Sequence, residues 1–186
     1  MKEKKIEPKI SLTVYTHLIG CICYVVRDNE NNILHLATQD YSILSTSLYN
    51  IRKITITKVN NIIQNYNPDT IVIEQTKLFT DGITRYPDPE VYKNIVLSYG
   101  LQVTLEDHFL ELVEHFLAIP YWDWSQTILN SKFKYILDRC KDHILLDNKL
   151  TETQMETVKH FNLYQAICFS ECVNHSKLMN KKYLIR

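Results

Sequence analysis

Residues 67–75 of the chain, Asn-Pro-Asp-Thr-Ile-Val-Ile-Glu-Gln, join a helix stop signal to a short apolar segment that ends in an acid. Pro68 disfavours a helical conformation in the residue before it, and Asp69 is a common turn residue. Residues 70–73 are all β-branched, which predicts a short buried strand. Glu74 closes this strand. An ionisable group in that place favours a functional role, and the alternative is a carboxylate that caps the following turn.

An amphipathic helix is predicted directly before this strand, from Ser45 to about Tyr66. Apolar residues recur there at helical spacing, with basic residues on the opposite side. A helix that leads into a buried strand indicates a parallel crossover connection.

Three strands are predicted before the helix, at residues 9–15, 20–26 and 33–37. The Asp/Asn-rich segment 28–32 joins the second and third strands as a hairpin. The chain therefore opens with an antiparallel, three-stranded unit.

The second half of the chain is predicted to be mainly helical. Residues 77–90 contain Gly82, Pro87 and Pro89 and are predicted to form a loop. Helices are expected at about 91–108, 125–144 and 152–174, whereas the periodicity of residues 110–119 fits a fifth strand or more helix. No repeat or linker interrupts the chain, so we expect one α/β domain over residues 1–186, with a basic C-terminal tail at 175–186.

The composition excludes several classes of protein. The 21 basic and 21 acidic residues among 186 give no net charge, which excludes a strongly basic nucleic-acid coat. The 45% hydrophobic content argues against intrinsic disorder. The three glycines are isolated, so Gly-rich phosphate-binding loops are excluded.

Cysteine usage and hydropathy indicate the cellular environment. The five cysteines form no CxxC pair, so we expect reduced, mostly buried thiols. No apolar run has the length of a membrane span or of a signal peptide. We therefore expect an intracellular, soluble protein that does not bind membranes.

The order of elements and the segment 67–75 resemble the RNase H-like fold, and within it the RuvC-like Holliday-junction resolvases. In that family a Pro-Asp leads into a buried strand that ends in a catalytic glutamate, which Glu74 matches. The length and the basic tail are most similar to the poxvirus and mitochondrial types. The resemblance implies a mixed five-stranded sheet flanked by helices, and a site in which several carboxylates hold Mg²⁺ for phosphodiester hydrolysis.

The other metal ligands of the family are only partly matched. Thr13 stands at the position aligned with the first acid. The last acids of the family form Asp-x-x-Asp before a small apolar run on the C-terminal helix. Glu156 takes the first of these positions, but Lys159 follows at i+3 and His160 lies one residue further. The resemblance implies Glu74, Glu156 and His160 as catalytic residues, with Glu74 and Glu156 as metal ligands in a degenerate site.

Candidate nucleic-acid contacts lie in a loop and at the C-terminus. His17 matches a basic position of the family motif. The basic residues after Glu171 form a segment without acids, which makes them candidate phosphate contacts: Lys177, Lys181, Lys182 and Arg186. The aromatic cluster 121–124 is a candidate for stacking on bases, with core packing or a subunit contact as the alternative.

Two functions from different classes remain open. The first is a Mg²⁺-dependent endonuclease that acts as a homodimer on branched or four-way-junction DNA in recombination. The second is a catalytically inactive descendant that serves as a viral structural or protein-interaction scaffold. A helical interaction module is a third hypothesis, which a sheet in the N-terminal half would exclude.

Overall fold

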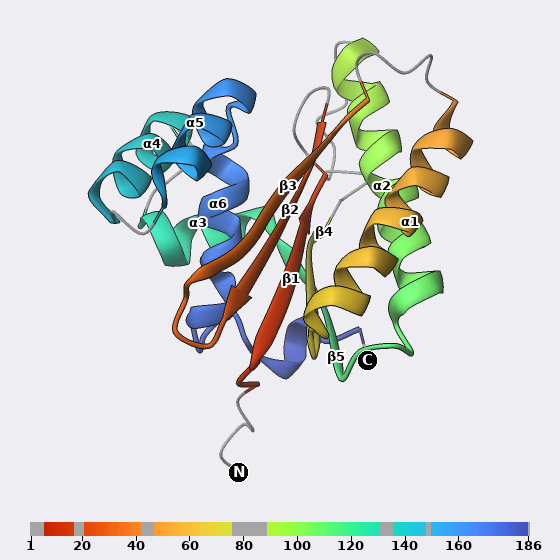
Figure 1. Ribbon diagram of the computed structural model, residues 1–186, viewed down its shortest axis with the longest axis horizontal. Coiled ribbons are helices and arrows are strands. Elements are labelled where there is room, and N and C mark those ends of the chain that lie inside the picture. Colours follow the sequence, from red (N-terminus) through yellow and green to blue (C-terminus); the bar gives the residue numbers. More distant parts are fainter. Residues whose placement is uncertain are drawn as a thin grey trace.

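A five-stranded mixed sheet with the strand order β3-β2-β1-β4-β5 forms the centre of the molecule (Figure 1). The structure is a computed structural model that describes residues 6–16, 21–41, 47–75, 89–130, 136–147 and 150–185. Its strands are β1 (Ile10–Tyr15), β2 (Cys21–Asp28), β3 (Ile33–Asp40), β4 (Thr70–Gln75) and β5 (His115–Pro120). Its helices are α1 (Leu48–Tyr66), α2 (Pro89–Phe109), α3 (Tyr121–Leu129), α4 (Ile136–Asp147), α5 (Glu152–Phe161) and α6 (Tyr164–Ser170), with the 3₁₀ turns η1 (Glu171–Asn174) and η2 (Lys181–Tyr183).

The antiparallel N-terminal unit is confirmed. β1 pairs with β2 and β2 with β3, both antiparallel. In the hairpin turn, the carboxylate of Asp28 accepts hydrogen bonds from the backbone N–H groups of Glu30 and Asn32. Asn31 adopts a positive φ of 71°, which Asn tolerates better than most residues. The Asp/Asn-rich segment 28–32 therefore forms the predicted hairpin turn through local interactions.

The parallel crossover is also confirmed. β1 and β4 pair in parallel, with α1 between them in the chain. Ser47 caps the start of α1 by accepting a hydrogen bond from the backbone of Asn50, and Asn67 ends it in the left-handed conformation. Residues 110–119, which the sequence left open, contribute β5, parallel to β4.

Helices cover both faces of the sheet. α1 and α2 lie on one face, and α3, α4, α5 and α6 lie on the other side (Figure 1). The alternating residues of the strands therefore enter two separate cores. Leu12, Val14 and Ile73 belong to the α1/α2 core, whereas Tyr15 and Val72 face the C-terminal helices.

Two predicted long helices are shorter than expected. The helix predicted at 152–174 is interrupted at Asn162, whose left-handed conformation ends α5, and the chain restarts as α6 and then η1. The helix predicted at 125–144 is also wrong, because α3 already begins at Tyr121 and Asn130 ends it in the same way. The predicted loop 77–90 lies outside the described residues as far as residue 88, and α2 begins at Pro89.

The C-terminal segment packs against the sheet. Leu178 and Met179 are buried, and Leu184 forms an antiparallel bridge with Leu117 of β5. The backbone N–H of Ile185 donates to the carbonyl of Phe116 at 2.9 Å. The segment thereby protects the edge of β5.

All five cysteines are free thiols in the interior, as predicted. None of the helices in the described part of the chain is both long and apolar enough to cross a bilayer.

Two histidines make stability depend on pH. Burial and the nearby charge of Lys58 lower the pKa of His35, and burial, opposed in part by Glu171, lowers the pKa of His175. Below the unfolded value of 6.5, the unfolded chain therefore binds more protons than the folded one. We expect the free energy of unfolding to fall between about pH 7.5 and about pH 5 in urea titrations. The double variant His35→Gln/His175→Gln should show a shallower decline, and an unchanged slope would contradict this assignment.

Candidate functional site

Glu74 lies beside Tyr15 on the face of the sheet that the C-terminal helices cover. The parallel register pairs Val14 with Ile73, so that Tyr15 and Glu74 follow as the next residues of their strands. Thr13 is level with Val72, two residues before Glu74. The register therefore brings the larger Tyr15, and not Thr13, level with Glu74.

The carboxylate of Glu74 is enclosed by hydrogen-bond donors and aromatic rings. Its exposure is 4%, and Trp124 Nε1 donates a hydrogen bond to its Oε2 at 2.7 Å. Tyr15 also forms a hydrogen bond with Glu74. The Trp124 ring packs edge-on against Tyr121 and Phe169, with centroid distances of 5.4 and 5.6 Å. We call these five residues the Glu74 cluster.

The charge of Glu74 acts on its neighbours. The pKa of Tyr15 lies well above its ordinary value because of burial and the negative charge of Glu74. The same two causes raise the pKa of Tyr121 to about 12 and raise that of Cys172. The two phenols and the thiol therefore stay neutral at physiological pH, and none of them becomes a second anion that could attract a cation.

Among the residues that the structure describes, the donor set around Glu74 does not fit a catalytic Mg²⁺ pair. Hard divalent cations need several oxygen ligands, commonly carboxylates and water. Glu74 is instead surrounded by an indole N–H, a phenol, aromatic rings and a buried thiol. Over the ranges that the structure describes, no group of three or more His, Cys, Asp or Glu side chains is arranged to hold a metal.

The structure does not bring Glu156 and His160 to Glu74. Both are exposed on α5 and, with Lys159, line a shallow surface hollow. The first turn of α5 lies at the β3 edge, where Gln154 Nε2 donates to the carbonyl of Ile33 at 3.3 Å. β2 and β1 separate that edge from β4, a span of about 14 Å at the usual strand spacing. The ligand roles of Glu156 and His160 therefore stay predictions from the sequence.

The helix that does pack on β1 and β2 is α6. It begins at Tyr164, two residues after the left-handed Asn162 that ends α5.

Tyr15 and Trp124 were also missed as partners of Glu74. The aromatic cluster 121–124 was the available signal, and core packing was one of the three roles considered for it. Trp124 is fully buried, whereas Trp122 is 49% exposed. Both tryptophans belong to the first turn of α3. The buried Trp124 therefore has a core role, and the exposed Trp122 has a surface role.

The candidate phosphate contacts are only partly described. Lys177, Lys181 and Lys182 are exposed. Lys182 Nζ lies 3.5 Å from Asp123 Oδ2, and it also lies 4.3 Å from the centre of the Tyr183 ring. His17 and Arg186 lie outside the described residues.

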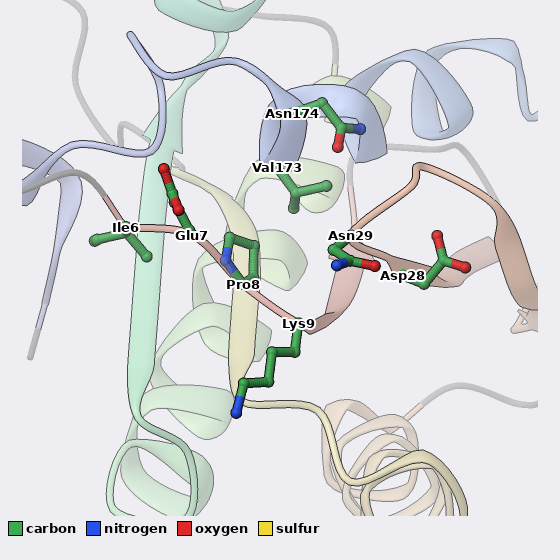
Figure 2. Close-up of a pocket in the computed structure, with 8 residues that line it drawn as sticks. All are labelled: Ile6, Glu7, Pro8, Lys9, Asp28, Asn29, Val173 and Asn174. Atoms are coloured by element: carbon green, nitrogen blue, oxygen red, sulfur yellow. The ribbon is translucent and has the colours of Figure 1, made fainter.

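A separate polar cavity of about 460 Å³ lies at the opposite end of β1 from Tyr15 (Figure 2). It is formed by residues 6–9, the hairpin residues Asp28 and Asn29, and Val173 and Asn174 of η1. The carboxylate of Asp28 is already engaged by the hairpin turn. The cavity therefore offers no second catalytic set.

The solved structures similar to this chain include Holliday-junction resolvases. RuvC of T. thermophilus in complex with a Holliday junction substrate is 11% identical, covers 85% of this chain and 92% of its own, and has a TM-score of 0.50. The yeast mitochondrial Holliday junction resolvase Ydc2 is 12% identical, covers 96% of this chain and 82% of its own, and has a TM-score of 0.54. No protein-family model and no curated protein matches the chain. The chain thus has a RuvC-like, RNase H-like α/β fold, as predicted.

Proposed function

We propose that this protein binds branched DNA through its RuvC-like fold without cutting it. The observation that carries the proposal is the hydrogen bond from Trp124 Nε1 to Glu74 at 2.7 Å, within a cluster that also contains Tyr15. The position that matches the catalytic glutamate is thereby enclosed by protein groups. A fold retained while its metal ligands are replaced is consistent with retained binding and lost hydrolysis.

The ligand class is inferred from the neighbours that share the fold. One of them is RuvC in complex with a Holliday junction substrate. A four-way junction has a two-fold axis, so a protein that recognises it as a whole fits a two-fold homodimer. The exposed lysines at positions 177, 181 and 182 provide phosphate contacts on a chain whose net charge is zero.

A first prediction separates binding from cleavage. Purified protein should retard a synthetic four-way junction more strongly than a linear duplex of the same length, with affinity that falls as salt rises. With Mg²⁺ or Mn²⁺ added, the DNA should stay intact. The metal should also leave the thermal unfolding midpoint of the DNA-free protein unchanged, because a metal that binds the folded protein would raise this midpoint. Cleavage that disappears in Glu74→Gln would show a working metal site and would overturn the non-catalytic part of the proposal.

A scaffold that binds no DNA is the second candidate, and the zero net charge of the chain favours it. The same titration distinguishes the two functions. Equal, weak affinity for junction and duplex at low salt would support the scaffold and contradict junction recognition.

A further inference from the structure

A second cavity lies beside α3, the helix that carries the exposed Trp122. It measures about 420 Å³ and lies between α3 and the C-terminal segment. Its lining is mostly polar: Asp123, Gln126, Thr127, Asn130, Lys177, Leu178, Lys182 and Tyr183. We call it the α3 pocket. It is distinct from the Glu74 cluster, since Glu74, Tyr15 and Trp124 do not line it.

The charges of the α3 pocket favour an anion. The carboxylate of Asp123 is engaged by Lys182 at 3.5 Å and accepts a hydrogen bond from the Tyr183 hydroxyl. The hydrogen bond with Tyr183 and the charge of Asp123 raise the pKa of Lys182, which keeps its ammonium charged. Lys177 forms no ion pair with any residue of the described ranges. One uncompensated positive charge therefore faces the cavity, beside the amides of Gln126 and Asn130.

Trp122 stands one helical turn from the pocket. Residues Trp122 and Gln126 are related by i, i+4 on α3, so their side chains are neighbours on one helix face. Trp122 is 49% exposed, and its ring rests edge-on against Tyr121 at 6.0 Å between centroids. An exposed indole beside a second aromatic ring is a stacking surface for a nucleobase.

We propose that Trp122 and the α3 pocket form a subsite for one unpaired nucleotide. The base stacks on the indole of Trp122, and the adjoining phosphate enters the pocket and contacts Lys177. Trp122 and the pocket residue Gln126 are one helical turn apart on α3, about 5.4 Å along the helix axis, and this spacing suits a base and its own phosphate. The subsite prefers single-stranded segments, because bases paired within a duplex do not offer a free face. The inference rests on the proposed function only for the class of ligand, a nucleic acid.

The chain supplies its own reporter for this subsite. It contains two tryptophans, of which Trp124 is buried and Trp122 is exposed. Titration with short single-stranded oligothymidylate should quench the fluorescence of Trp122. In Trp122→Phe, where only Trp124 emits, the quenching should disappear while most of the binding remains. Quenching that persists in Trp122→Phe would overturn the assignment.

Two further substitutions test the base and the phosphate separately. Trp122→Ala should weaken oligothymidylate binding roughly 5- to 150-fold, the range expected for loss of one stacked base. Lys177→Ala should lower the salt dependence of binding by about one counterion. Lys53→Ala, an exposed lysine on α1 at the opposite face of the sheet, is the matched control and should bind normally. If Lys177→Ala and Lys53→Ala weaken oligothymidylate binding equally, Lys177 contributes only nonspecific charge, and the subsite is refuted.

Inorganic phosphate separates an anion pocket from a nucleotide subsite. Competition by phosphate alone, combined with an unaffected Trp122→Ala variant, would contradict the nucleotide assignment. Failure of this inference is distinguishable from failure of junction binding. Junction binding without quenching of Trp122 counts against the subsite alone, whereas quenching by oligothymidylate without junction preference counts against the proposed function alone.

Discussion

Arg27→Met is expected to lower the free energy of unfolding by about 3–5 kcal/mol, because it removes one partner from a buried network of charges. Arg27 on β2 is 2% exposed. Its Nε donates to Ser170 Oγ at 2.8 Å, and its Nη1 donates to the carbonyl of Asn31 at 2.8 Å. Its Nη2 lies 4.0 Å from the buried carboxylate of Glu171. After the substitution, Glu171 keeps the contact with His143 at 2.8 Å but loses its buried cationic partner.

The matched control for this prediction is Arg139→Met. Arg139 is exposed on α4, so the same chemical change should alter the free energy of unfolding by no more than about 0.5 kcal/mol. Urea unfolding of both variants, followed by circular dichroism, gives the comparison. Similar midpoints for the two variants would mean that the methionine side chain packs as well as the guanidinium network, an outcome known for some buried ion pairs.

The elements with a local cause were predictable from the sequence. The hairpin at 28–32 follows from Asp28 and its turn residues, and the crossover follows from the helix stop at residues 67–69. The position of Glu74 at the end of a buried strand was predicted correctly for the same reason. These features depend on neighbours within a few residues.

The partners of Glu74 could not be predicted in the same way. Trp124 lies 50 residues further along the chain, and its contact with Glu74 depends on how α3 leaves β5. Arg27 is similar, because its partner Ser170 is 143 residues away and stands on a helix whose start the sequence misplaced. Asn162 interrupts the predicted helix through a left-handed backbone conformation, which a helical hydrophobic pattern does not report. Long-range pairing and single backbone reversals are therefore the features around Glu74 that the sequence did not predict.

The hydrogen bond between Trp124 and Glu74 is expected to stabilise the fold measurably. Trp124→Phe keeps an aromatic ring in the core but removes the N–H donor to a buried carboxylate. We expect the free energy of unfolding to fall by about 1.5–3 kcal/mol from the lost hydrogen bond to a charged group, with a further loss from the smaller ring. Trp122→Phe, the same change at an exposed position, should shift it by about 0.5 kcal/mol or less.

A double-mutant cycle isolates the contact from the change in packing. Glu74→Gln keeps the shape and one acceptor oxygen of the side chain while removing its charge, so Trp124→Phe should cost less in the Gln background than in the native one. A coupling energy of about 1 kcal/mol or more would identify Glu74 as a structural partner of Trp124. A coupling near zero would mean that the carboxylate gains nothing from the indole, and the stabilising role assigned to the Glu74 cluster would then be wrong. The double-mutant cycle measures stability, whereas the junction assay measures cleavage. Together they distinguish a structural role of Glu74 from a catalytic one.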